Sequence, residues 1–197
     1  LRGPGRGLYG EPGSREAQRV VLREAGLIDA GGGWTGGAAT LWFMGDYFDR
    51  GPDGIAAIDL VRRLQGEAAA AGGHVGALLG NHDVLILAAG RCGDAPSGGP
   101  GGTFRSSWRA NGGEERDLAR LDDDRLAWLR ALPAMALDGD WLLATDPQNS
   151  GVQAGWPAKW LFTVTNPFPP RIIFRPISLK PGSFLASAML KILSCLL

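Results

Sequence analysis

The fold is decided by residues 39–83, which read ATLWFMGDYFDRGPDGIAAIDLVRRLQGEAAAAGGHVGALLGNHD. Residues 39–44 are a continuous apolar run bounded by glycines, a pattern typical of a strand buried on both faces. Within residues 52–71 apolar side chains recur every three residues from Ile55 to Leu64, which predicts an amphipathic helix ending at the glycine pair that follows. Residues 74–79 read as a second buried strand. Strand, crossover helix and strand form a βαβ unit, so we expect parallel strands and an α/β fold.

Further elements are predicted on either side of this unit. Residues 14–25 have the spacing of a helix, residues 122–132 resemble a helix with acids at its positive end, and residues 135–144 read as a hairpin. Residues 90–113 are rich in Gly, Pro and Ser and long for a connector, which indicates a lid or a substrate-facing loop. Trp108, within that stretch, is either a core residue or a substrate contact.

A short polar string follows each of the two predicted parallel strands. Gly45–Pro52 comes after the first strand, and Gly80–Asp83 comes after the second. In an open parallel sheet, binding sites form outside the carboxyl ends of the strands, so we expect the two strings to share one pocket. Clustered carboxylate, amide, imidazole and guanidinium groups are what metal-assisted phosphoryl chemistry requires.

Each polar side chain in these strings suits one part of that chemistry. Asp46 is a hard oxygen ligand able to bridge two cations, and Asn81 adds an amide oxygen. Arg50 offers a planar fork that matches a phosphate. His82 is able to protonate a leaving alkoxide near neutral pH, and Asp49 is able to hold its imidazole in the useful tautomer.

At these residues the chain resembles the calcineurin-like metallophosphoesterases. The string at residues 45–51 is especially similar to the Ser/Thr phosphoprotein phosphatase branch. The family pattern has three strand-end motifs, Asp-x-His, Gly-Asp-x-x-Asp-Arg and Gly-Asn-His-Glu/Asp, and the last two stand here complete. The resemblance implies a β-sandwich of the metallophosphoesterase type flanked by helices, incomplete in this chain. It also implies two divalent metal ions, Mn, Fe or Zn.

The resemblance also implies a role for each matching position. Asp46 would bridge two metals and Asn81 would bind the second. His82 would be the general acid paired with Asp49, and Arg50 would hold the phosphate of the substrate. Asp83 fills the place of the acidic residue that closes the last motif, as a support for the others.

The chain departs from the family pattern in its remaining ligands. Gly7–Gly10 stands nearest to the place of the first motif and has neither carboxylate nor imidazole. The chain contains only two histidines, His74 and His82, so the two later metal-binding histidines are missing. We therefore expect weakened metal binding and a truncated or incomplete relative. Two functions stay open, a metal-dependent phosphatase and a catalytically inactive fragment that at most binds a partner.

Charge divides the chain into two parts. All 20 acidic residues lie between Glu11 and Asp146, whereas all three lysines lie at or beyond Lys159. This division predicts a partial phosphoesterase domain over residues 1–146 and an atypical tail, disordered or aberrant, over residues 147–197.

Composition excludes several other classes of function. The first part is acidic and has no Lys/Arg stripe, which argues against nucleic-acid binding. Residues 184–197 are apolar but fall short of the roughly 20 residues that span a bilayer. The opening residues have no apolar run typical of a secretory signal, so a cytoplasmic protein without a membrane partner is expected. The expected partner is a phosphorylated substrate, either a protein, a dinucleoside polyphosphate or a small phosphomonoester; the oligomeric state stays open.

Overall fold

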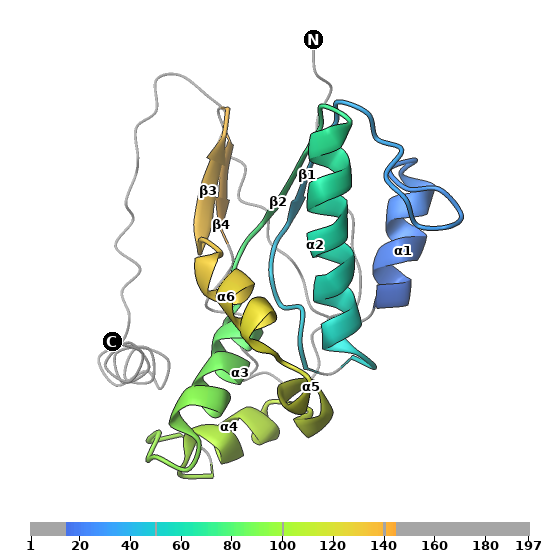
Figure 1. The fold of residues 1–197 in the computed structure, drawn as a ribbon. Coiled ribbons are helices and arrows are strands. Elements are labelled where there is room, and N and C mark those ends of the chain that lie inside the picture. Colours follow the sequence, from blue (N-terminus) through green and yellow to red (C-terminus); the bar gives the residue numbers. More distant parts are fainter. Residues whose placement is uncertain (1–14, 50, 100, 140, 145–197) are drawn as a thin grey trace.

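The computed structural model describes residues 15–49, 51–99, 101–139 and 141–144 (Figure 1). Arg50 and the predicted tail over residues 147–197 lie outside these ranges. Helices and strands alternate in the first half of the described chain, which confirms the α/β class. In chain order the elements are α1 (Arg15–Glu24), β1 (Thr40–Phe43), α2 (Gly54–Ala70), β2 (His74–Ala77), α3 (Asn81–Cys92), α4 (Phe104–Ala110), α5 (Glu115–Ala119), α6 (Asp123–Ala131), β3 (Met135–Asp138) and β4 (Trp141–Ala144).

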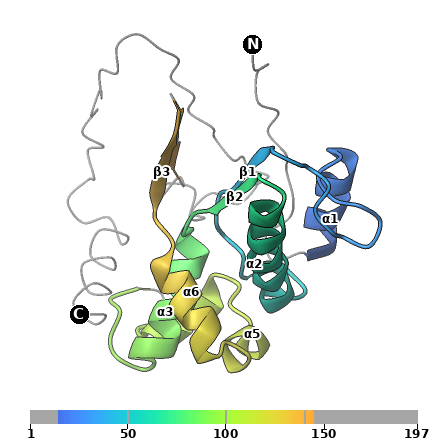
Figure 2. The same ribbon diagram turned by 45° about the horizontal axis from the view of Figure 1, so that its top comes forward.

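The predicted βαβ unit is present and its strands are parallel. Thr40 of β1 lies opposite His74 of β2, and Phe43 lies opposite Ala77. Helices α1 and α2 lie side by side along this pair of strands, and α3 to α6 gather beyond the carboxyl ends of the strands (Figures 1 and 2). The prediction that β1 is buried on both faces is wrong, because its residues are exposed or only half-buried. In the described part of the chain the sheet holds just these two strands, so β1 is incompletely covered.

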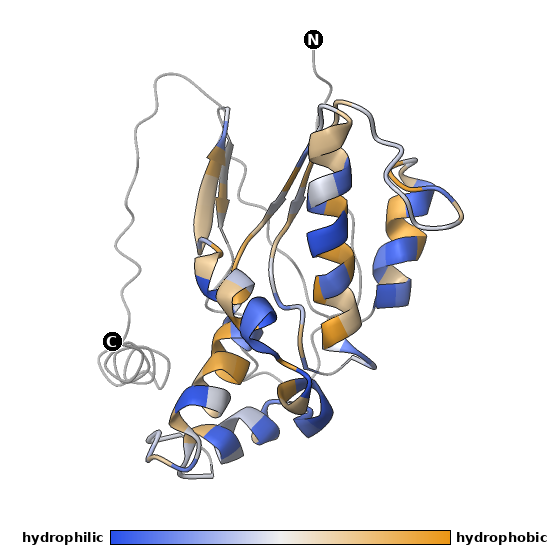
Figure 3. Cartoon of the chain, viewed as in Figure 1, coloured by the Kyte–Doolittle hydropathy of each residue, from blue (hydrophilic) through white to orange (hydrophobic). Residues whose placement is uncertain are grey.

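Helix α2 begins where two aspartates satisfy its first backbone N–H groups. Asp53 is the N-cap and its carboxylate accepts a hydrogen bond from the backbone N–H of Ala56 at 2.8 Å. The carboxylate of Asp117, from α5, accepts one from the N–H of Gly54 at 3.0 Å. Polar and apolar residues are interleaved along α2 (Figure 3). The predicted apolar positions form its buried face, namely Ile55, Ile58, Val61 and Leu64.

The hydrophobic core holds the first polar string in place. Tyr47 and Phe48 stand between Asp46 and Asp49 in that string, and both are almost completely buried. They pack in one cluster with Ile58 of α2, with α3 and with α6. Burying the two aromatic side chains that stand between the acids fixes the loop, because large apolar side chains gain several kcal/mol on leaving water.

Part of the stretch predicted as a long loop is helical. Residues 104–110 form α4, which begins at a capping box between Thr103 and Ser106. The short helix α5, residues 115–119, was not predicted. The second polar string also lies on a helix, because Asn81 is the first residue of α3. Helix α4 therefore takes the place of part of the lid or substrate-facing loop that the composition suggested.

The predicted hairpin is present as β3 and β4, which pair antiparallel with Met135 opposite Ala144. A hydrogen bond connects this hairpin to the parallel pair β1 and β2: the indole N–H of Trp42 on β1 donates to the carboxylate of Asp138 on β3 at 3.2 Å. No helix in the described ranges is both long and apolar enough to cross a bilayer.

One surface cluster has a predictable dependence on pH. Hydrogen bonds from Arg105, aided by Arg109, hold the pKa of Glu115 at about 2, below its ordinary value of 4.5. Because the folded-state pKa is lowered, the charged carboxylate stabilises the fold above about pH 4.5 and loses that effect as the pH falls towards 2. We expect Glu115→Gln to lower the urea midpoint at pH 7, only modestly since the carboxylate is partly exposed. The difference from the parent protein should shrink between pH 4.5 and pH 2; a difference independent of pH would contradict this assignment.

Candidate functional site

The two polar strings meet backbone to backbone. A Cβ atom on Gly45 would overlap the backbone of Gly80, and one on Gly80 would overlap the backbone and carboxylate of Asp46. Gly45 also has φ = 88°, a left-handed conformation that glycine adopts without strain. Two glycines at the strand ends therefore allow the loops after β1 and β2 to touch.

Asp83 joins the two loops from inside. Its side chain is completely buried and accepts hydrogen bonds from three backbone N–H groups, those of Asp46 at 2.9 Å, Gly80 at 2.8 Å and Tyr47 at 2.8 Å. Burial, together with the nearby carboxylate of Asp46, raises the pKa of Asp83 to about 7. The sequence motif identified Asp83 only as a support; the structure shows that it connects the two strings.

Asp46 is held beside the first turn of α3. It has φ = 57°, which a non-glycine residue adopts at a cost of about 1–2 kcal/mol, and the contacts of Asp83 with its backbone help to hold it there. One carboxylate oxygen accepts a hydrogen bond from the backbone N–H of His82 at 3.0 Å. The carboxylate thus lies at the positive end of the helix dipole.

His82, Asp49 and Trp108 form a buried chain of hydrogen bonds. Nδ1 of His82 lies 2.8 Å from one carboxylate oxygen of Asp49. The other oxygen accepts from the indole N–H of Trp108 at 2.9 Å. All three residues are at most 5% exposed. A carboxylate at Nδ1 favours a proton on that nitrogen, so Nε2 is the nitrogen that takes up a second proton and, when the ring is protonated on both nitrogens, can give it to a reacting group.

The structure decides between the two roles that the sequence left open for Trp108. Its side chain is completely buried, so the prediction of a substrate contact is wrong. Its indole instead fixes the orientation of Asp49, 59 residues earlier in the chain. In the sequence, Trp108 stands among polar residues in a glycine-rich stretch, and nothing in that pattern indicates Asp49 as its hydrogen-bond partner.

Asn81 has an unsatisfied polar group in the site. Its side-chain Nδ2 is buried and makes no hydrogen bond. The two ends of an amide are nearly identical in shape, so the same position suits an Oδ1 that faces a cation. Asp46 and Asn81 together offer the hard oxygen donors that divalent metals accept.

These donors fit one edge of a metal site and do not complete it. Among the described residues, no three His, Cys, Asp or Glu side chains are grouped so that they could hold a metal ion. His74 is exposed at the amino end of β2, whereas Asn81 follows the carboxyl end of that strand, so His74 does not add a ligand. Arg50 lies outside the described residues, and its predicted contact with phosphate stays a prediction.

The parallel βαβ unit ends in a shared corner of acidic and histidine side chains, and comparison with known proteins assigns the chain to a family. The profile of the family described as calcineurin-like phosphoesterase matches residues 13–167. The chain therefore belongs to the calcineurin-like phosphoesterase family, as the sequence resemblance indicated. Membership implies divalent metal ions in general terms, without selecting the metal or the number of ions.

Two curated relatives and one solved structure illustrate the match. Shewanella-like protein phosphatase 2 of Arabidopsis thaliana is 36% identical over 75 residues, 38% of this chain and 19% of the relative. The symmetrical bis(5'-nucleosyl)-tetraphosphatase of Aromatoleum aromaticum is 32% identical over 119 residues, 60% of this chain and 36% of the relative. The cold-active protein-tyrosine phosphatase of a psychrophilic Shewanella species superposes with a TM-score of 0.52 and 24% identity, over 66% of this chain and 38% of that one. The chain thus spans about a third or less of the curated relatives, and the solved structure supports the fold alone.

Proposed function

We propose that this chain carries the proton-donating half of a metal-dependent phosphoester hydrolase. The observation that carries the proposal is the buried pair of His82 and Asp49, in which Nδ1 lies 2.8 Å from a carboxylate oxygen. Asp49 follows Asp46 by three residues in the same loop. When the ring is protonated on both nitrogens, an imidazolium held through Nδ1 can give its Nε2 proton to the oxygen that leaves the phosphorus atom and return to neutral imidazole. Such proton transfer prevents a poor leaving group from departing as an alkoxide.

The other site residues support that step. Asp49 keeps the imidazole ring oriented, Trp108 orients Asp49, and Asp83 keeps the two loops in contact. Arg50 is proposed to bind the phosphate by its planar guanidinium group. Asp46 and Asn81 are proposed as ligands of two divalent ions drawn from Mn, Fe or Zn, with Asp46 shared between them. Such an ion, when bound, supplies Lewis-acid activation of the phosphoryl group and of water.

The substrate is proposed to be a phosphorylated protein or a small phosphoester. The string over residues 45–51 favours a branch similar to the Ser/Thr protein phosphatases, and one relative is named as a protein phosphatase. A second relative is named as a dinucleoside tetraphosphatase, which keeps that substrate class in consideration. The partial domain over residues 1–146, the atypical tail over residues 147–197 and a cytoplasmic location remain parts of this proposal.

A second candidate function is a catalytically inactive member of the family that binds a partner. The observation that favours it is the incomplete ligand set: the described residues hold no three-residue metal cluster, and the whole chain has two histidines.

Hydrolysis of p-nitrophenyl phosphate with added Mn²⁺ separates the two functions. We expect metal-stimulated turnover that falls more than about 100-fold in Asp46→Asn. Loss of a residue that hydrogen-bonds to a metal ligand typically costs about 10–100-fold in metal affinity or activity, and loss of the ligand itself should cost more. Asp124→Asn, which removes an exposed carboxylate on α6, is the matched control and should keep full activity. Folded protein without turnover that depends on Asp46 would establish the inactive alternative.

A further inference from the structure

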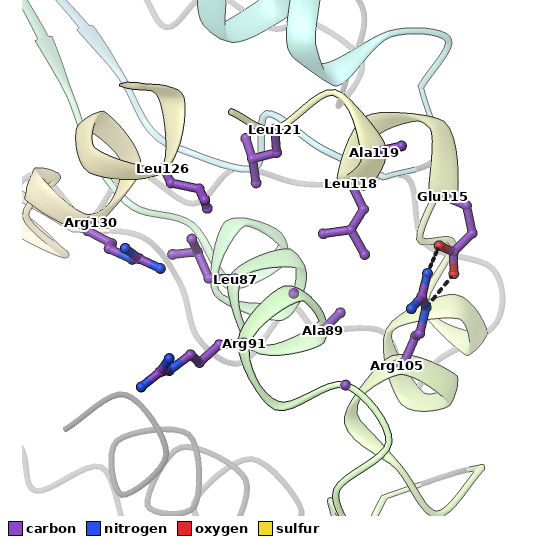
Figure 4. Close-up of a pocket in the computed structure, with 12 residues that line it drawn as sticks. Leu87, Ala89, Arg91, Arg105, Glu115, Leu118, Ala119, Leu121, Leu126 and Arg130 are labelled. Atoms are coloured by element: carbon purple, nitrogen blue, oxygen red, sulfur yellow. Dashed lines mark hydrogen bonds and ion pairs between the residues drawn. The ribbon is translucent and has the colours of Figure 1, made fainter. Parts of the chain in front are cut away.

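A pocket lies away from the candidate active site, among helices α3, α4, α5 and α6 (Figure 4). Its volume of about 530 Å³ is within the range of pockets that bind ligands. Helix α3 connects the two places: Asn81 is its first residue, and Arg91 near its end lines the pocket. At 1.5 Å per residue, those two backbone positions are about 15 Å apart. A molecule in this pocket therefore occupies a site distinct from the catalytic corner.

The middle of the pocket is apolar. Gly90 allows α3 to approach α5, since a Cβ atom there would lie 3.1 Å from the side chain of Leu118. Leucines from three helices and one connecting segment face the cavity (Figure 4), namely Leu87, Leu118, Leu121 and Leu126. A floor of this kind accepts a branched aliphatic side chain.

One end of the pocket is positively charged. Arg91 on the last turn of α3 and Arg130 on the last turn of α6 border the same end of the cavity (Figure 4). Both are exposed, and among the described residues neither forms an ion pair. At the other end, Arg105 is paired with Glu115, which also binds Arg109. The pocket therefore combines an apolar floor with two cations that have no carboxylate partner in the described part of the chain.

Charge complementarity identifies the kind of occupant. Residues 147–197 carry five basic residues and no acidic one, and residues 1–14 carry two arginines and one glutamate. Both segments would meet like charge at Arg91 and Arg130, so neither suits the pocket. The chain up to residue 146 is acidic overall, with 15 arginines and 20 acids, which opposes docking on an anionic membrane or a nucleic acid. A short acidic segment avoids this long-range repulsion better than an extended polyanion does.

We propose that this pocket binds an acidic peptide segment of a partner protein, with a leucine-like side chain on the apolar floor and carboxylates against Arg91 and Arg130. This site is additional to the proposed phosphoesterase function and does not depend on it. A simpler role for the two arginines is to neutralise the negative ends of α3 and α6. The two roles differ in what a change of charge does: the first changes peptide binding and the second changes only stability.

The test measures fluorescence anisotropy of a fluorescein-labelled peptide, acetyl-Glu-Leu-Glu-Glu-Leu-Glu-amide, with the full chain. We expect saturable binding that weakens about 10-fold or more in the Arg91→Glu and Arg130→Glu double variant, because two attractions become repulsions. Ala119→Trp, at an exposed position lining the pocket, should block binding by filling the cavity while both arginines remain. The matched control is Arg15→Glu with Arg23→Glu on α1, which makes the same change in net charge and should bind normally.

Three outcomes would overturn the proposal. One is that the parent protein, the Arg91→Glu and Arg130→Glu double variant and the Ala119→Trp variant all bind the peptide with equal affinity. This outcome includes the case in which the double variant loses thermal stability and nothing else. Another is equal binding of a peptide with lysine in place of each glutamate. The third is a concentration-dependent dimer that the same variants abolish while peptide binding is absent, since a second copy of the chain would then be the occupant.

Discussion

Replacing His82 by alanine is expected to slow hydrolysis of phenyl phosphate by about 10²–10⁴-fold, the usual contribution of a general acid. Hydrolysis of p-nitrophenyl phosphate should fall far less. The nitrophenolate ion is stable enough to leave without a proton, whereas phenolate depends on one from the imidazole. The measurement is kcat/KM for both esters in parent and variant, at equal Mn²⁺ concentration.

The matched controls for this prediction come from the same chain. His74→Ala removes the other histidine, which is exposed at the start of β2, and should leave both rates unchanged. Asp49→Asn should show the same dependence on the leaving group with a smaller loss, because the imidazole remains but its orientation and tautomer are no longer fixed. If His82→Ala slows both esters equally, His82 is not the proton donor.

Replacing Asp83 by alanine is expected to lower the free energy of unfolding by about 3–5 kcal/mol. The change leaves three N–H groups without an acceptor, those of Tyr47 and Gly80, which are buried, and that of Asp46, which is half-buried. It also opens the junction at which the loops after β1 and β2 meet. Urea denaturation followed by tryptophan fluorescence measures the effect without any assumption about activity.

Asparagine at the same position separates the hydrogen bonds from the bulk of the side chain. One carboxylate oxygen of Asp83 serves Asp46 and Gly80, and the other serves Tyr47. An amide oxygen can keep the first two bonds, while its NH₂ group faces the third donor, so Asp83→Asn should cost about 1–3 kcal/mol. Asp124→Asn on the exposed side of α6 should change stability by less than about 0.5 kcal/mol. Equal stability of the alanine and asparagine variants would contradict the proposed acceptor role.

Much of the fold and the candidate site was predictable from local patterns. The apolar run before Gly45, the periodic helix after Pro52 and the second run before Gly80 fixed a parallel βαβ unit, which the structure confirms. The expectation that both polar strings lie at the carboxyl ends of these strands also agrees with the structure. The pattern failed where glycine and serine content suggested a loop, because the capping residues Thr103 and Ser106 begin a helix there.

The sequence by itself determined the order of the central elements and which side chains with metal-binding or proton-donating chemistry follow each strand, since periodicity and strand-end motifs report contacts within a few residues. Only the tertiary structure decided which groups meet across the fold. The indole of Trp108 reaches Asp49 over 59 residues, and Asp83 reaches the backbone of Asp46 over 37. Those pairs depend on how α3 and α4 pack against the buried aromatic residues of the first loop. Burial and distance are properties of the packed chain, and no short segment contains them.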